Sequence, residues 1–385
     1  MKSNYDILGN YIRLIDARNK DNVTNKVMGI NIDKFFMPSV ANVIGTDLSK
    51  YKLITKGKFA CNPMHVGRDE RLPVALYGED EPALVSPAYF MFEIIDNNVL
   101  DENYLMMWFR RAEFDRICWL HTDGSVRGGI TWDDICRMEL PVPDIGEQRK
   151  MVEAYKSVEE RIQLKRKIND NLVASLYVFY KEHFTNANTQ YSKVPLQKIC
   201  SKIGSGATPK GGKTAYIDEG ISLIRSTNVF DFRFEYSDLA HINQNQADAL
   251  ANVNVKPNDI LFNITGVSVA RCCMVPDDVL PARVNQHVMI VRPIKGENMS
   301  YYIMFTLCSA DNKAKLLGIG QSGSTREAIN KQELESFEIP IPNDNSINEF
   351  GEAAKRVYKH IHCNVKEMHA LGEMKTVLLA QLSSR

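Results

Sequence analysis

The chain has 385 residues, which is enough for two or three domains, and its apolar fraction of 44% and charged fraction of 24% are typical of a soluble globular protein. Its 47 basic residues balance its 47 acidic residues, so any surface for nucleic acid has to be a local patch. The first residues contain no apolar run, and no stretch is apolar over the length of a bilayer, so we expect neither a signal peptide nor a membrane span.

The eight cysteines are scattered along the chain, and none of them forms a C-x-x-C pair that would suggest a metal or redox site. Scattered cysteines are typical of reduced core thiols in the cytoplasm. We therefore predict a cytoplasmic protein without a metal site.

Residues 1–146 are predicted to form a first globular segment. The segment 89–94 is typical of a buried strand, and 104–111 of an amphipathic helix. Near its end, Thr131 followed by Asp134 predicts a helix N-cap with an acid at the third position. A Pro-x-Pro edge strand and Asp144, as the cap of a long helix, complete the segment.

Residues 147–185 are predicted to form this long helix. Apolar residues recur at alternating steps of four and three, from Met151 to Phe179, which is the a/d pattern of a coiled coil. A second globular segment is expected at 186–342. A second long helix at 343–385 repeats the same seam from Phe350.

The two halves of the chain are related by a constant offset of 199 residues. Met151 and Phe350 have this spacing, and so do the later seam positions, including Lys165 and Asn364. The loop and cap before each helix keep the same offset, with Thr131 replaced by Asn330. The sequence therefore predicts a tandem duplication in an α+β fold. Two globular α/β domains form a pseudo-repeat and are joined by two long antiparallel coiled-coil helices related by an approximate two-fold axis.

Polar residues interrupt the helix seam at Lys165, Asn364, Asn169 and Lys375. Polar a/d residues can fix the register of a coiled coil at some cost in stability. A solvated break in the seam explains them equally well, and the sequence does not choose between these alternatives.

This arrangement resembles the specificity (S) subunit of Type I restriction-modification systems. The similarity extends over essentially the whole chain and is carried by the repeated Gly-Ser-x-Arg and Pro-x-Pro motifs that precede each helix. Further motifs of that family correspond to residues 47–64, 84–89, 206–210, 220–225, 258–266 and 285–287.

The resemblance implies that each globular domain is a target recognition domain that reads one half of a bipartite, asymmetric site in double-stranded DNA. It implies that the helices set the spacing and dock two methyltransferase (M) subunits, with restriction (R) subunits as a further partner left open. The chain itself would carry no catalytic residue and no cofactor, and S-adenosylmethionine would bind to the methyltransferase subunits.

A reader of duplex DNA needs cations for phosphates and amide, hydroxyl or guanidinium groups for base edges. Our candidates in the first segment are Asn62, His65, Arg68, Arg71, Ser125 and Arg127. Our candidates in the second segment are Lys210, Lys213, Arg225, Thr227, Asn263, Thr265, Arg271, Asn285, Gln286, Ser324 and Arg326. Arg127 and Arg326 occupy the repeated loop and are the preferred phosphate contacts.

Two stretches imitate catalytic motifs. Asn62-Pro-Met-His lacks the second proline and the aromatic residue of the N-P-P-aromatic motif of amino-methyltransferases. Residues 206–213 resemble a P-loop but have one residue too many before Lys213. We therefore expect no catalysis by this chain. A protein–protein scaffold, with two adaptor domains on a coiled-coil strut, remains the alternative function.

Overall fold

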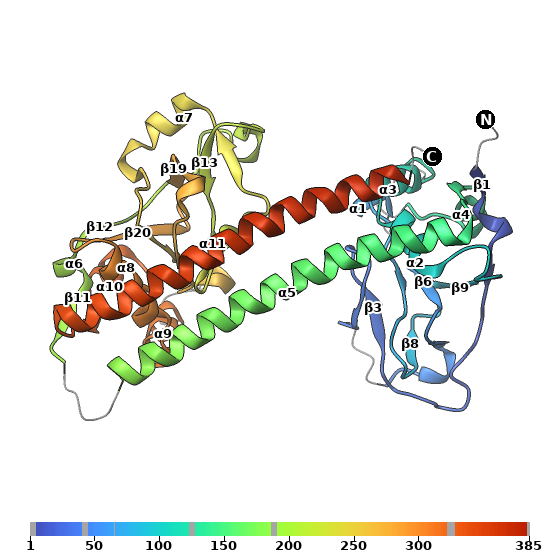
Figure 1. Ribbon diagram of the computed structural model, residues 1–385, viewed down its shortest axis with the longest axis horizontal. Coiled ribbons are helices and arrows are strands. Elements are labelled where there is room, and N and C mark those ends of the chain that lie inside the picture. Colours follow the sequence, from blue (N-terminus) through green and yellow to red (C-terminus); the bar gives the residue numbers. More distant parts are fainter. Residues whose placement is uncertain are drawn as a thin grey trace. The chain divides into compact units, whose positions relative to one another are not determined.

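The computed structural model describes residues 5–40, 45–64, 66–122, 128–185, 191–321 and 328–382 (Figure 1). The chain divides into two compact units. Unit 1 comprises Met1–Leu164 and Met368–Arg385, and unit 2 comprises Lys165–Glu367. Each unit therefore combines one globular part with part of each long helix. Among the described residues, no helix is long and apolar enough to cross a membrane.

Unit 1 is built on an antiparallel four-stranded sheet of order β2-β9-β6-β7. These strands are β2 (Ile12–Leu14), β9 (Phe90–Ile94), β6 (Phe59–Cys61) and β7 (Val74–Leu76). Its core also contains side chains of α2 (Glu102–Phe109) and α3 (Ala112–Leu120). The aromatic rings of Phe59 and Phe92, on adjacent strands, stack with 5.1 Å between their centroids. Burial of these large aromatic side chains stabilises the core of this unit.

Shorter elements complete unit 1. The hairpin β3–β4 and the pair β5–β8 enclose a smaller core, and β1 pairs with β10 next to the long helix. Their bounds are β1 (Tyr5–Ile7), β3 (Met28–Ile30), β4 (Phe36–Pro38), β5 (Lys52–Ile54), β8 (Ala83–Val85), β10 (Glu139–Pro141), η1 (Leu8–Asn10), η2 (Leu48–Lys50), α1 (Val66–Asp69) and α4 (Trp132–Cys136).

Unit 2 repeats the same sheet, in the order β12-β20-β17-β18. The strands are β12 (Cys200–Ser205), β20 (Val288–Pro293), β17 (Ile260–Asn263) and β18 (Cys272–Met274). The helices α8 (Glu297–Cys308) and α9 (Ala310–Gln321) follow the sheet, as α2 and α3 do in unit 1. The identical strand order confirms the tandem pseudo-repeat.

The two units differ most in the segments that connect the strands of the main sheet. In unit 2 these segments form the three-stranded sheet β16-β13-β19 and the hairpin β14–β15. The remaining elements of unit 2 are β11 (Lys193–Pro195), α6 (Leu196–Ile199), η3 (Gly212–Ala215), β13 (Ile221–Ile224), η4 (Ser226–Asn228), β14 (Val229–Phe230), β15 (Arg233–Phe234), β16 (Ala240–Ile242), α7 (Gln244–Ala249), η5 (Ala251–Val253), η6 (Gly266–Ser268), η7 (Asp277–Val279), β19 (Ala282–Val284), α10 (Lys331–Ser336) and β21 (Glu338–Pro340).

Matching hydrogen bonds show how closely the sheets correspond. The Ile130 amide donates to the Pro63 carbonyl over 3.1 Å in unit 1, and the Ile329 amide donates to the Ile264 carbonyl over 2.9 Å in unit 2. Both bonds join the turn after the third sheet strand to the segment that leads into the cap helix. The predicted caps are confirmed, since both Thr131 and Asn330 form capping boxes with the third helical residue.

An ion pair between the sheet strands is also repeated, with its charges exchanged. Lys58 pairs with Glu93 in unit 1, whereas Asp259 pairs with Arg292 in unit 2, with 2.6 Å between Oδ1 and Nε. Lys58 and Asp259 precede β6 and β17, and Glu93 and Arg292 lie in β9 and β20. Both units therefore have an ion pair of opposite charges at these positions, although the residue types differ.

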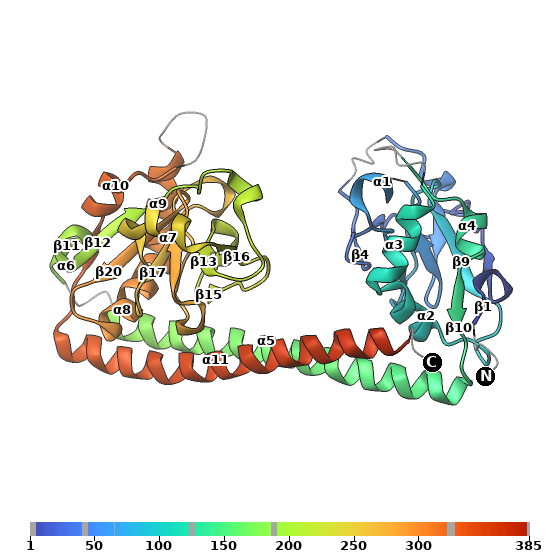
Figure 2. The same cartoon turned by 90° about the horizontal axis from the view of Figure 1, so that it is seen from above.

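The two long helices are α5 (Ile145–Phe184) and α11 (Asp344–Gln381), close to the predicted ranges. Asp144 caps α5, because its Oδ1 accepts a hydrogen bond from the Gly146 amide over 2.8 Å. In unit 2 the C-terminal half of α5 runs antiparallel to the first half of α11, where Phe179 stacks on Phe350 at 6.0 Å (Figure 2). In unit 1 the other ends meet, and Leu382 shares a core with Val152.

Candidate nucleic-acid interface

Four loops of unit 2 are held together at one end of its main sheet, where the strands end. We call them the loop cluster, and they comprise residues 206–211, 225–228, 264–271 and 285–287. The Gly206 amide donates to the Asn285 carbonyl over 3.1 Å, and the Asn285 amide donates to the Ile224 carbonyl over 3.0 Å. The Ile264 amide donates to the His287 carbonyl over 3.0 Å. Backbone bonds therefore fix the positions of loops from four different parts of the chain.

Gly206 is required for this close approach. A Cβ atom at this position would lie 1.7 Å from the Val284 carbonyl oxygen, which is far inside van der Waals contact. Only glycine allows the loop after β12 to pass so close to β19. The predicted Gly-Ala-Thr-Pro motif thus has a packing role at its first residue.

Hydroxyl, amide and imidazole groups meet within the loop cluster. Thr265 Oγ1 lies 2.7 Å from His287 Nδ1. The Thr208 hydroxyl donates to Gln286 Oε1, and Gln286 Nε2 lies 3.2 Å from His287 Nε2. Gln286 and Thr227 are exposed, so they remain accessible to a ligand. Such groups are suited to hydrogen bonds with base edges.

Cations flank these groups. Arg271 lies over the Phe230 ring, with 4.9 Å from Cζ to the centroid, and Arg225 lies over the Tyr216 ring at 5.6 Å. Both arginines are half-buried, whereas Lys210 is exposed. Stacking on an aromatic ring restricts a guanidinium without neutralising its charge. Lys213 lies in η3, a turn of four residues, so the segment 206–213 does not lead into the long helix that follows a P-loop.

Two of the predicted DNA contacts in unit 2 are buried side chains. Asn263 is 0% exposed, and its Nδ2 donates to the carbonyls of Ser226 and Val229 over 2.9 and 3.2 Å. Asn285 is 8% exposed, and its Oδ1 accepts a hydrogen bond from the His287 amide over 3.0 Å. In the structure both side chains are instead committed to backbone groups inside the loop cluster.

The candidates of unit 1 do not form a comparable cluster among the described residues. Asn62 is half-buried, and its Oδ1 accepts a hydrogen bond from the Met64 amide over 3.2 Å. Arg68 and Arg71 are exposed but form ion pairs, at 2.6 Å with Asp69 and at 2.9 Å with Asp33. Their charges are therefore partly compensated within the unit.

Five predicted residues lie outside the described part of the chain. They are His65, Ser125, Arg127, Ser324 and Arg326. The residues that follow the two repeated loops are described: Gly128 accepts a hydrogen bond from the Gly67 amide over 3.1 Å, and Ala328 forms a β-bridge with Thr265. The residues that follow both repeated loops therefore contact the segment after the third sheet strand.

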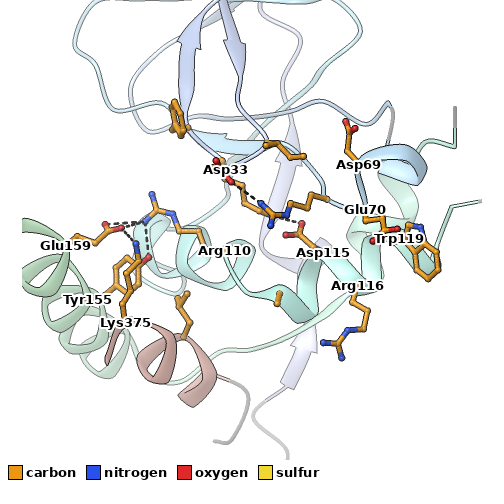
Figure 3. A pocket seen from close by; sticks show the side chains of 16 residues that line it. Asp33, Asp69, Glu70, Arg110, Asp115, Arg116, Trp119, Tyr155, Glu159 and Lys375 are labelled. Carbon is orange, nitrogen blue, oxygen red and sulfur yellow. Dashed lines mark hydrogen bonds and ion pairs between the residues drawn. The ribbon is translucent and has the colours of Figure 1, made fainter. Parts of the chain in front are cut away.

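Unit 1 contains a cavity of about 960 Å³ that no sequence motif indicated (Figure 3). Its charged lining residues largely pair with one another. Lys34 Nζ lies 2.6 Å from Asp115 Oδ1, and Glu159 binds both Arg110 and Lys375. Burial lowers the pKa of Lys34 in spite of its carboxylate partner. No cluster of three or more His, Cys, Asp or Glu side chains suited to a metal occurs in the described residues.

Comparisons with known proteins agree with this geometry. Residues 188–361 match the family model described as "Type I restriction modification DNA specificity domain". The whole fold is similar to that of the S subunit of a Type I restriction-modification system from M. genitalium, with a TM-score of 0.55 and 14% sequence identity over 98% of this chain and 95% of that chain.

Two further solved structures are similar over the same extent. One concerns complex assembly and conformational transition of the type I R-M system, with a TM-score of 0.45 and 15% identity over 98% of this chain and 96% of that chain. The other is the HsdS subunit from Thermoanaerobacter tengcongensis, with a TM-score of 0.36 and 14% identity over 98% and 95%. Residues 188–361 are thus similar to the Type I restriction-modification DNA specificity domain, and the chain as a whole has a fold like that of the S subunit from M. genitalium.

Proposed function

We propose that this chain is the sequence-reading subunit of a cytoplasmic Type I restriction-modification complex, and that each globular part reads one half of a bipartite site in double-stranded DNA. The loop cluster of unit 2 carries this proposal, because it lies within the segment that matches the specificity-domain family. It places exposed amide and hydroxyl groups next to cations, on loops that are held by backbone hydrogen bonds. A protein that reads base edges requires this combination of groups.

The candidate DNA contacts of unit 2 divide into two roles. Gln286, Thr227 and Thr265 are the candidates for base edges, and a glutamine amide can bind the N6 and N7 atoms of adenine in a bidentate manner. Lys210, Lys213, Arg225 and Arg271 are the candidates for phosphates, together with Ser324 and Arg326 of the repeated loop. Asn62, His65, Arg68, Arg71, Ser125 and Arg127 remain the corresponding proposals for unit 1.

The two half-sites are expected to differ in sequence. The main sheet is the same in both units, but the connection between its last two strands is not. In unit 1 the connection from β6 to β7 contains α1, whereas in unit 2 the connection from β17 to β18 contains η6. Different loops on a common sheet support an asymmetric site.

The long helices are proposed to dock two methyltransferase subunits. Exposed apolar side chains recur at the same repeat position: Val178 of α5 is 53% exposed and Val377 of α11 is 56% exposed. These valines are 199 residues apart, so each helix has an exposed apolar side chain at the same repeat position. This repetition supports two equivalent contacts with partner subunits. S-adenosylmethionine would bind to those subunits, and restriction subunits could complete the complex.

Co-expression with candidate methyltransferase subunits, in a host that lacks DNA methylation, tests this function. We expect modified bases at one bipartite site, and two methyltransferase subunits per chain in the native mass of the complex. Methylation without any sequence preference, or a stable complex with one such subunit even at excess, would contradict the proposal.

A second experiment separates DNA reading from the alternative, a protein–protein scaffold. The affinity of the complex for random duplex should fall linearly with salt on logarithmic axes, because phosphate contacts release counterions. A scaffold would show no such binding. The pure chain, incubated with labelled S-adenosylmethionine and duplex DNA, should transfer no label, because the proposal leaves catalysis to the partner subunits.

A further inference from the structure

Val267 is the most exposed of the large apolar residues described in the chain, with 97% of its surface accessible. It lies in the middle of the turn η6, between Gly266 and Ser268. The turn is held by a hydrogen bond of 2.9 Å from the Val269 amide to the Gly266 carbonyl, and Gly266 has a φ of +69° that favours glycine. The backbone therefore fixes where Val267 projects.

The rest of the turn packs inward. Val269 and Ala270 are buried, and the Ala270 amide donates to the Asn263 carbonyl over 2.8 Å. Val267 itself thus contributes little to the core. Exposing a valine to water costs more free energy than exposing the polar residues that are usual in turns. An exposed, β-branched side chain with few rotamers on an anchored turn is well suited to contact a partner.

The surroundings of Val267 are those of the proposed DNA reader. Thr265 precedes the turn and contacts His287, and the Ser268 hydroxyl lies 3.4 Å from the Thr265 carbonyl oxygen. Both Thr265 and Gln286 of the loop cluster are therefore close to the base of the turn. An apolar side chain among polar base readers is complementary to an apolar feature on the DNA.

Such a feature is found on one base of unmodified DNA, because thymine presents its C5-methyl group in the major groove. Side chains that wedge between base steps in the minor groove are longer or larger, such as Phe, Leu, Ile, Met and Pro. We propose that Val267 contacts a thymine methyl group in the half-site read by unit 2. This inference rests on the proposed function and adds a specificity-determining residue to it.

The test uses the full chain in complex with its methyltransferase subunits and duplexes that carry the mapped site. Each thymine is replaced by deoxyuridine, one position at a time, which removes the methyl group and leaves the hydrogen-bonding groups unchanged. For the natural chain we expect one position at which deoxyuridine weakens binding about fourfold, the factor that corresponds to about 0.8 kcal/mol for one buried methyl-sized group.

Val267→Ala should abolish the effect at that position and leave the effects at all other positions unchanged. Val40→Ala is the matched control, because Val40 is 91% exposed but belongs to unit 1. It should retain the discrimination between thymine and uracil. Since both valines are exposed, neither substitution should alter folding, and thermal unfolding of the two variants checks this.

Three results would overturn the inference while leaving the proposed function intact. In the first, deoxyuridine has no effect at any position. In the second, the same position still distinguishes thymine from uracil in Val267→Ala. In the third, Val267→Ala changes the recognition of a half-site that contains no A·T pair. Failure of the proposed function itself gives a different result, because the complex would then prefer no DNA sequence.

Discussion

Lys165 of α5 and Asn364 of α11 are hydrogen-bonded to each other, with 2.9 Å between Nζ and Oδ1. They are 199 residues apart and therefore occupy the same position of the two repeats. Asn364 also donates to Asn169 over 2.7 Å, and Lys165 forms an ion pair with Glu367 at 2.8 Å. These four residues form a connected polar layer, which favours a role in fixing register over a solvated break in the seam.

The polar layer can be tested by replacing its centre. A double variant, Lys165→Leu with Asn364→Leu, should unfold at about the same urea concentration, because an apolar pair at the helix contact offsets the loss of this half-buried polar pair. It should also self-associate, since the register is no longer specified. Lys165→Leu alone should cost about 1–3 kcal/mol, because it leaves polar partners unsatisfied. Urea unfolding and light scattering measure both effects, and a double variant that remains a single species would contradict the register role.

Asn263 and Gln286 should behave differently when each is replaced by alanine. Asn263→Ala removes a buried amide that binds two backbone carbonyls, and it should lower the free energy of unfolding by about 1–3 kcal/mol. Gln286→Ala removes an exposed side chain, so it should leave stability nearly unchanged but relax the preference at one base pair by about 1–3 kcal/mol. Thermal unfolding and base-modification mapping distinguish the two. A normal melting temperature for Asn263→Ala would contradict its structural role.

Arg127 and Arg326 remain the preferred phosphate contacts of the repeated loops. Arg127→Ala and Arg326→Ala should each weaken binding to all duplexes alike and reduce the slope of log affinity against log salt by about one. Lysine at either position should restore most of the slope, because it restores the charge. If both alanine variants bind like the natural chain at every salt concentration, these loops do not face DNA.

The repeat made much of the fold predictable from the sequence. The offset of 199 residues places the caps, the Pro-x-Pro strands and the long helices, and all are present in both units. The ion pairs Lys58–Glu93 and Asp259–Arg292 escaped notice for a physical reason. An ion pair forms whichever of the two strands carries the positive charge. Neither position therefore has the same residue type in the two units.

The site was less predictable, because burial depends on groups that are distant in the chain. An asparagine side chain at the end of a strand can hydrogen-bond equally well to a base in a DNA groove or to the backbone of a turn. Asn263 is a core residue because the carbonyls of Ser226 and Val229 lie within reach of its amide. Val267 was missed because a single valine has no periodicity, and its exposure depends on how η6 folds back on β17 and β18.

Glu159 should give unit 1 a component of stability that is lost in acid. Burial raises the pKa of its carboxyl, but the hydrogen bond from Lys375 and the charges of Arg110 and Lys375 outweigh burial and hold the pKa below its ordinary value. A lowered carboxyl pKa stabilises the fold above the unfolded pKa of about 4.3, and this contribution disappears as the pH falls through the folded pKa.

Glu159→Gln should therefore lower the free energy of unfolding by about 1 kcal/mol at pH 7 and should show a weaker loss of stability below about pH 4.3 than the natural chain. Urea unfolding between neutral and acidic pH measures this. Glu160→Gln, a change at an exposed neighbour on the same helix, is the control and should follow the natural chain. Identical pH profiles for Glu159→Gln and Glu160→Gln would show that the contacts to Arg110 and Lys375 do not stabilise the unit.

The last prediction concerns the long helices as the spacer between the two half-sites. A heptad inserted after Lys165 keeps the seam of α5 in phase, and a matching heptad after Asn364 keeps that of α11. Each insertion adds about 10 Å of helix, equivalent to roughly three base pairs, and three base pairs rotate one half-site by about 100°. We therefore expect weaker binding overall, with the remaining specificity shifted to a gap one to three base pairs longer and both half-sites unchanged.

Modified-base mapping on a random library measures the gap directly. A heptad inserted into α5 alone is the control, and it should disrupt the helix pair without producing a new gap. An unchanged gap at full activity, or altered half-site letters, would show that the helices do not set the spacing.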